Sequence, residues 1–165
     1  MSVAQFFITA HGPTQRETKP MSCIKGAIDN FFFVKWIKTE VADADQIVVD
    51  VRALNDEHDG RVRYIAIIGP EVEPPSDEVR SSMKSNVDEL LRYCESVHIV
   101  IEGKGFRRAM ARSIGTGIFL LSKNRGRTFA HDSVEQALTR AGADETEANL
   151  VLARARERGF VAATT

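Results

Sequence analysis

Apolar runs alternate with amphipathic stretches along most of the chain. Residues 31–39, 61–69 and 97–101 are rich in aromatic and β-branched residues, and this composition predicts strands. Residues 40–56 and 76–95 carry apolar residues at spacings of three and four, and this period predicts helices. The second half of 61–69 is almost continuously apolar, which is typical of a strand that is covered on both faces.

The same pattern continues towards the C-terminus. A glycine turn after residue 101 leads into a helical pattern over 106–123 and a short strand over 127–131. Two further helices are predicted over 132–141 and 144–158, because each begins with residues at the spacing of a capping box. The chain from residue 97 onwards is therefore expected to continue a β-α-β arrangement and to end in helices.

This alternation predicts an α/β fold. Such connections give a mostly parallel sheet with right-handed crossovers. We expect a four- to five-stranded sheet flanked by helices, with the fifth strand antiparallel at one edge. The chain is divided into an N-terminal extension or edge strand (1–22), an α/β domain (23–142), and a C-terminal helix and tail (143–165).

Length, charge and cysteine content narrow the class of protein. The chain has 165 residues and a net charge of -1, which suits a single domain and indicates no general attraction to nucleic acid or membranes. Cys23 and Cys94 form no CxxC pair, which is typical of a reducing compartment. No apolar run approaches the roughly 20 residues of a membrane helix. We therefore expect a cytoplasmic protein without an integral membrane segment.

The charge is unevenly distributed along the chain. Residues 103–131 contain seven basic residues and no acidic residue, whereas the helix expected over 40–56 has an acidic face. This layout favours a basic surface for an acidic protein partner, an anionic small ligand or a lipid. The alternative is that the basic and acidic helices pair within the fold or across a dimer. The candidate binding residues are Lys104, Arg107, Arg108, Arg112, Lys123, Arg125 and Arg127.

Other candidate chemistry is sparse. Residues 103–105 resemble an anion-binding glycine turn, but Arg108 stands where a dinucleotide fingerprint needs glycine, so a tight turn is the preferred interpretation. His98 and His131 belong to neighbouring candidate strands, and we expect them to approach each other in a packing or hydrogen-bonding role. The four histidines lack metal-ligand spacing. We expect no catalytic residue, metal, cofactor or nucleic-acid partner.

The chain contains four stretches with a shared character: RYIAIIG, VHIVIEG, the helix that begins FRRAM, and RTFAHDSVEQAL. Together they resemble the STAS-like proteins of the SpoIIAA-like group, which are relatives of anti-sigma-factor antagonists. The resemblance covers about residues 31–141 and rests on element order and hydrophobic pattern. It implies a small α/β domain that is not an enzyme and that binds a protein partner, often as a homodimer, with switching by phosphorylation or a small ligand in some members.

The resemblance has one departure that concerns regulation. Phosphorylatable members carry a serine or threonine at the start of a helix after a central strand, but residues 103–105 contain no hydroxyl group. Ser76, beside Asp77, is the remaining candidate phospho-acceptor, and its alternative role is to cap the helix that follows. We expect a regulatory protein-interaction domain; the alternative is a small-ligand or lipid-binding module of the same fold.

Overall fold

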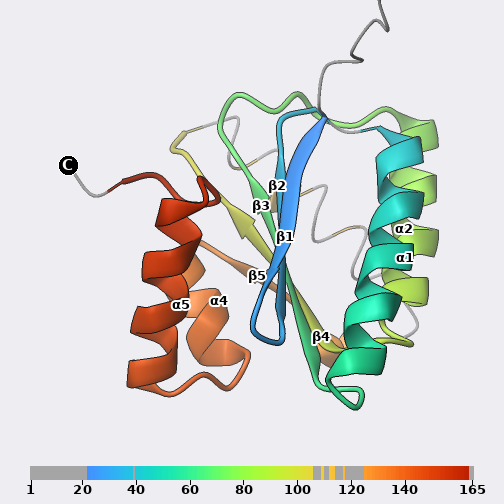
Figure 1. Ribbon diagram of the computed structural model, residues 1–165. Coiled ribbons are helices and arrows are strands. Elements are labelled where there is room, and N and C mark those ends of the chain that lie inside the picture. The colour runs from blue at the N-terminus through green and yellow to red at the C-terminus, as the bar shows by residue number, and fades with distance from the viewer. Residues whose placement is uncertain are drawn as a thin grey trace, which may run out of the picture.

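The computed structural model describes residues 22–38, 40–105, 109, 112, 113, 117 and 125–163. These residues form an α/β fold around a five-stranded sheet in the order β1-β2-β3-β4-β5 (Figure 1). β1 is antiparallel to β2, and the remaining neighbours are parallel. The strands are β1 (Cys23–Ile28), β2 (Phe31–Trp36), β3 (Val62–Ile68), β4 (Cys94–Ile101) and β5 (Thr128–His131).

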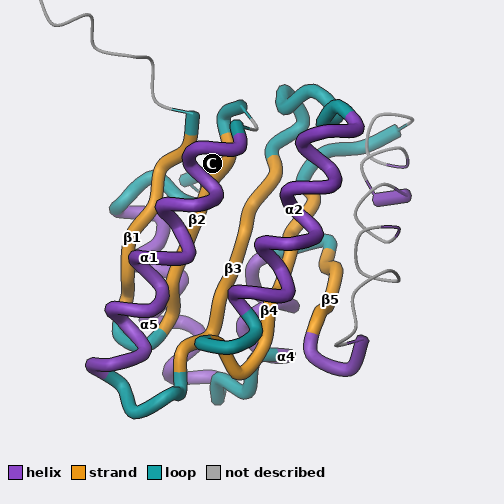
Figure 2. The backbone as a smooth tube through the Cα atoms, turned by 90° about the vertical axis from the view of Figure 1, so that its right-hand side faces the viewer, coloured by secondary structure: helices purple, strands orange, loops and turns teal. Residues whose placement is uncertain are grey.

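Helices cover both faces of the sheet. From β2 onwards each strand is added on the same side of the previous one, so right-handed crossovers place α1 and α2 on one face. Figure 2 shows these two helices next to each other in front of the sheet. α4 and α5 cover the opposite face (Figure 1). The helices are α1 (Val41–Glu57), α2 (Asp77–Leu90), α4 (Val134–Arg140) and α5 (Glu145–Glu157), with a 3-10 turn, η1 (Arg125–Arg127), before β5.

The sheet separates two apolar cores. In β2, Val34 and Trp36 face α1 and α2, whereas Phe31 and Phe33 face α4 and α5. Successive side chains in a strand point to opposite faces, so a strand between two helical layers must be apolar at nearly every position. This requirement explains the dense apolar runs of β2 and β3.

The C-terminal helices belong to the same core as the rest of the fold. Val151 and Leu152 of α5 are buried against the sheet face that carries Phe33, and Phe160, which follows α5, stacks on Phe33 with ring centroids 5.4 Å apart. The segment that follows α4 therefore packs into the same apolar core as the strands.

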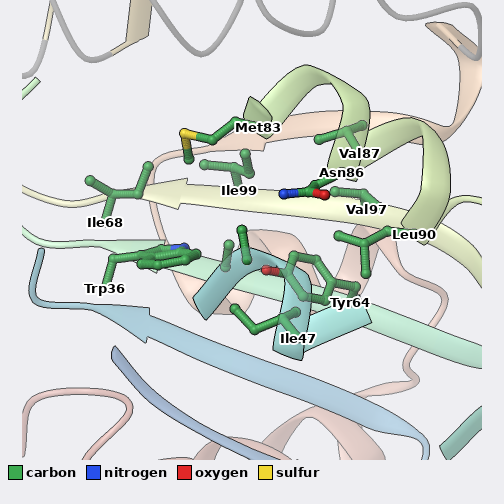
Figure 3. Close-up of a pocket in the computed structure, with 12 residues that line it drawn as sticks. Trp36, Ile47, Tyr64, Ile68, Met83, Asn86, Val87, Leu90, Val97 and Ile99 are labelled. Atoms are coloured by element: carbon green, nitrogen blue, oxygen red, sulfur yellow. The ribbon is translucent and has the colours of Figure 1, made fainter. Parts of the chain in front are cut away.

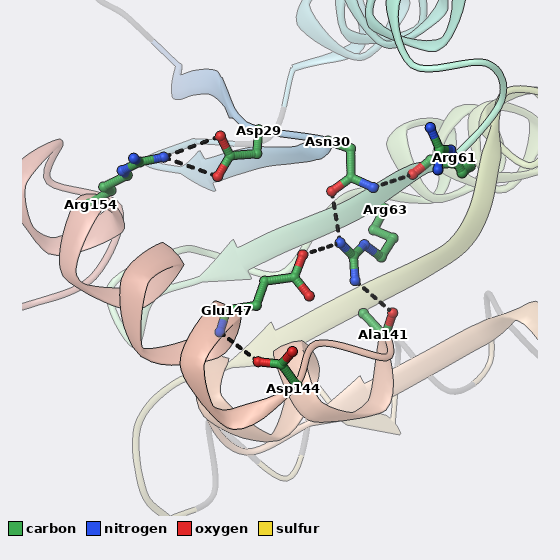
Figure 4. A network of polar contacts seen from close by, with 8 residues as sticks. All are labelled: Asp29, Asn30, Arg61, Arg63, Ala141, Asp144, Glu147 and Arg154. Atoms are coloured by element: carbon green, nitrogen blue, oxygen red, sulfur yellow. Dashed lines mark hydrogen bonds and ion pairs between the residues drawn. The ribbon is translucent and has the colours of Figure 1, made fainter.

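Arg63, near the start of β3, links three segments of the chain (Figure 4). Its guanidinium donates hydrogen bonds to Asn30 Oδ1 at 2.7 Å, to Glu147 Oε1 at 2.5 Å and to the Ala141 carbonyl at 3.2 Å. It also lies 3.8 Å from the centroid of the Phe31 ring. The β1–β2 hairpin, the α4–α5 connection and α5 are thus joined at one buried cation.

Two exposed arginines of the C-terminal segment also contact the hairpin. Arg154 donates to both carboxylate oxygens of Asp29 at 3.1 and 3.0 Å. Arg158 donates to the Ala27 carbonyl of β1 at 2.5 Å. These contacts hold the C-terminal end of α5 beside β1.

Two elements predicted from the sequence have different boundaries in the structure. The antiparallel edge strand exists, but it spans Cys23–Ile28, and residues 1–21 lie outside the described part. The helix expected over 76–95 ends at Leu90, and Cys94 already belongs to β4, where it pairs with Val62 of β3. None of the described helices has the length and apolar character needed to cross a membrane.

Candidate ligand pocket

An apolar pocket lies between the sheet and the helices α1 and α2 (Figure 3). Its floor includes Trp36 of β2, Tyr64 and Ala66 of β3, and Ile99 of β4. These side chains share one sheet face because they occupy alternate positions on neighbouring parallel strands. The pocket is therefore centred on β3, the middle strand of the sheet.

The walls come from the two helices. α1 contributes Ala44 and Ile47, and α2 contributes Met83, Asn86 and Leu90. These residues recur at spacings of three and four, which places each set on one helix face. The space exists partly because the lining includes short side chains, Ala44 on the helix and Ala66 on the sheet.

The pocket is small in this conformation. It contains a cavity of about 40 Å³ within about 460 Å³ of space that is not filled by atoms and that opens to solvent. A cavity of this size holds a water molecule, whereas an engineered cavity of about 150 Å³ is known to bind benzene. A ring-sized ligand therefore requires one wall to move outward.

Besides the indole N–H of Trp36, two polar groups interrupt the apolar lining. Tyr64 is 4% exposed, and its hydroxyl makes no hydrogen bond to any residue that the structure describes. Burial raises the pKa of this phenol, so the group stays protonated and acts as a donor. The amide of Asn86 makes only a long hydrogen bond, 3.5 Å from Nδ2 to Ser82 Oγ. Figure 3 shows both polar groups among the apolar lining residues.

A histidine pair lies on the opposite face of the sheet, below α4. His98 Nδ1 is 2.9 Å from His131 Nε2, and His98 Nε2 is 2.8 Å from Ser96 Oγ. The expected approach of the two histidines is confirmed. Burial, then the neighbouring charges of His131 and Arg140, lower the pKa of His98 to about 4, and burial also lowers the pKa of His131. Both rings are therefore neutral at neutral pH, and they pack as a hydrogen-bonded pair.

The described part of the chain brings no three His, Cys, Asp or Glu side chains together in a way that suits a metal ion. Cys23 and Cys94 are free and buried, and burial raises the pKa of both thiols, that of Cys94 to about 12. A thiol protonated in this way is a poor nucleophile and a poor metal ligand. The two cysteines serve as small apolar core residues.

The predicted basic residues have different environments. Lys104 is exposed in the loop after β4. Arg112 forms an ion pair with Asp132 at 3.2 Å, and Arg127 donates to the backbone carbonyls of Glu95, at 2.8 Å, and Cys94, at the start of β4. Two candidates are thus engaged within the chain. The backbone of Arg125 belongs to η1, and Arg107, Arg108 and Lys123 lie outside the described residues.

Ser76 caps α2, as one of its two expected roles requires. Its Oγ accepts a hydrogen bond from the Val79 backbone N–H at 3.3 Å. Its role as a phospho-acceptor stays a prediction.

The glycine turn after β4 packs directly on the loop that precedes α2. A Cβ added at Gly103 would lie 2.9 Å from Pro70 Cβ. The φ of Gly103 is +105°, so its backbone conformation as well as this close approach favours glycine.

Comparisons of the chain with models of known families, with curated proteins and with solved structures found no match.

Sequence reasoning missed the pocket. The available signal was a small residue, Ala66, in the middle of an otherwise bulky buried strand, together with Ala44 in the apolar stripe of α1. Neither alanine indicates a cavity until the fold places both on the same sheet–helix interface.

Proposed function

We propose that the protein is a non-enzymatic, STAS-like binding domain that holds a small, mainly apolar ligand between its sheet and the α1–α2 layer. The pocket around Tyr64 carries this proposal. Apolar pockets with a few convergent polar groups are the usual form of small-ligand sites. The Tyr64 hydroxyl lines this pocket and makes no hydrogen bond with the described residues, so it is available to pair with a bound ligand.

The test compares two alanine substitutions on α1. Ala44 is 7% exposed and lines the pocket, whereas Ala42 is exposed on the same helix. We expect ligand-detected NMR with a set of small apolar molecules to find binders for the native chain. Ala44→Leu fills the space and should lower the affinity for these molecules by about tenfold or more. Ala42→Leu should leave the affinity unchanged. Equal binding by both variants, or no binder at millimolar concentration, contradicts the proposal.

A second candidate function is regulatory binding of a protein partner, as the STAS-like resemblance implies. Lys104, exposed after β4, and Ser76, exposed at the start of α2, favour this function, because both follow the carboxyl ends of neighbouring parallel strands. The surface would include Arg107 and Arg108, and a homodimer or phosphorylation of Ser76 would be part of its regulation.

The test of this second function uses charge reversal. A partner isolated from the native cell and then purified should bind the unmodified chain and fail to bind a variant with Lys104, Arg107 and Arg108 changed to glutamate. The matched control is Arg52→Glu, since Arg52 is exposed on α1. Equal binding of the partner to the triple variant excludes the basic surface.

A further inference from the structure

We infer that the ligand of the pocket is an uncharged, ring-sized molecule that carries one hydrogen-bond acceptor, such as a ketone, an amide or an ether oxygen, and that this acceptor binds the hydroxyl of Tyr64. This inference rests on the proposed ligand-binding function and adds the chemical class of the ligand.

The lining excludes a charged ligand. The lining residues that the structure describes include no Lys, Arg, Asp, Glu or His. An ion that enters such a site loses its hydration without gaining a counter-ion, and this desolvation is far more costly than that of a neutral polar group. A carboxylate or phosphate group is therefore expected to stay outside, which separates this ligand from the anionic ligands that the basic residues suggested.

The polar groups select an acceptor. Tyr64 is 4% exposed and protonated, and its hydroxyl lines the pocket without a hydrogen-bond partner among the described residues. Its ring is fixed by stacking on Phe32, with centroids 6.3 Å apart and planes 10° apart. The O–H group is thus held beside the pocket as a donor, and the Asn86 amide of α2 adds a further N–H donor together with a carbonyl acceptor. A ligand with a single oxygen acceptor pairs with these donors.

The helix α2 determines the size of the ligand. The present cavity of about 40 Å³ is smaller than a six-membered ring requires. α2 has only Val87 and Leu90 buried within its length, whereas α1 buries Ala44, Ile47, Val51 and Leu54. An outward shift of α2 therefore breaks fewer apolar contacts than a shift of α1 or the sheet. A single ring requires a smaller outward shift of α2 than a long acyl chain does.

The experiment uses acetophenone and ethylbenzene, which have nearly the same shape and differ by one carbonyl oxygen. Their dissociation constants are measured by NMR titration with the full chain, with Tyr64→Phe and with Tyr93→Phe. Tyr93 is the control because its hydroxyl lies outside the pocket, 3.5 Å from Glu89 Oε1. We expect Tyr64→Phe to raise the dissociation constant of acetophenone about fivefold, which corresponds to the loss of one hydrogen bond. The dissociation constant of ethylbenzene should not rise. Tyr93→Phe should change neither.

The outcomes separate the two proposals. If both molecules bind and Tyr64→Phe weakens neither, the acceptor class is wrong while the pocket stands. If ethylbenzene binds the native chain, Ala44→Leu abolishes that binding, and acetophenone does not bind, the proposed acceptor class of ligand is again overturned. If neither molecule binds the native chain, both the pocket and the ligand class are overturned.

Discussion

His98 shows how a single buried residue constrains the protonation of its surroundings. Both ring nitrogens are hydrogen bonded, one to Ser96 and one to His131, and a neutral imidazole supplies one donor and one acceptor for these bonds. The ring also stacks on Phe129 at 5.2 Å, and Arg140 lies 4.5 Å from the Phe129 ring on the α4 side. A proton added to His98 would turn an acceptor into a second donor and place a cation near Arg140 and Arg63.

The consequence is a loss of stability in acid. The pKa of His98 in the folded chain is about 4, below its ordinary value of 6.5, so the unfolded chain takes up the proton first. The contribution of His98 to the free energy of unfolding is fully present above about pH 6.5. This free energy falls by about 3 kcal/mol as the pH decreases to 4. His131 acts in the same direction, because its pKa is also lowered. Urea unfolding measured from pH 7.5 to 4 checks this prediction.

Substitution identifies the residue responsible. His98→Gln removes the titrating group, so the unfolding free energy of this variant should depend less steeply on pH between 6.5 and 4. His58→Gln is the control, since His58 follows α1 and lies outside the pair. A steep dependence that persists in His98→Gln would show that other groups cause the acid loss.

At the scale of elements, α1 and α2 lie on the same sheet face but are anchored differently. α1 places four residues of its apolar stripe in the core, and Asp50 pairs with Lys25 of β1. α2 buries Val87 and Leu90 only, both in its second half, and its first half is held mainly by the Ser76 cap. Local opening free energies follow the number of buried apolar contacts, so α2 should open at a lower free energy than α1.

We expect hydrogen exchange to distinguish these helices. Amides in the first half of α2 should exchange before those of α1, because they have fewer buried side chains to release. Saturating acetophenone should slow exchange in α2 and leave α1 almost unchanged. Mass-spectrometric exchange on peptides from 41–57 and 77–90 makes the measurement. Slower exchange in α2 than in α1 without ligand would rule out α2 as the movable wall.

The type of an element was predictable where its sequence pattern suited only a helix or only a strand. The alternation around Val34 and Trp36 and the caps at Ser133 and Asp144 led to β2, α4 and α5, and the structure confirms all three. The boundary at Cys94 was wrong, because its spacing from Leu90 suits a helix face as well as a strand. Only pairing with β3 decides between these states, and pairing depends on residues distant in the chain.

The candidate site was less predictable than the fold. The approach of His98 and His131 followed from strand adjacency alone, and the structure bears it out. The pocket depends instead on the volume missing at Ala44 and Ala66 and on the orientation of the Tyr64 hydroxyl. These quantities arise from packing between layers, and no local sequence pattern encodes them.

At the scale of the whole molecule, Arg63 connects parts that are distant in the chain. It is 8% exposed and bridges the hairpin, the α4–α5 connection and α5. Three hydrogen bonds offset the desolvation of this guanidinium, although its buried Nε has no partner among the described residues. Removal of the side chain leaves Asn30 and Glu147 without this donor. The assembly of the C-terminal helices onto the sheet therefore depends on this residue.

Substitution of Arg63 should cost far more stability than substitution of an exposed arginine. Arg63→Met keeps the apolar stem beside Phe31 but removes the charge, and we expect a loss of about 2–4 kcal/mol in urea unfolding. Arg154→Met breaks the exposed pair with Asp29 and should cost at most about 1 kcal/mol. Similar losses for both variants would mean that the Arg63 network is not the main link between the layers.

The contact between Arg158 and the Ala27 carbonyl also affects how copies of the chain can associate. β1 is one of the two edge strands of the described sheet, and exposed edges are where foreign strands add and where aggregates begin to grow. Arg158 occupies one backbone acceptor on this strand, and Arg154 places a second cation at the adjoining turn. Growth of a continuous sheet across two molecules would have to displace both side chains. Association of two chains through the β1 edge is thus disfavoured.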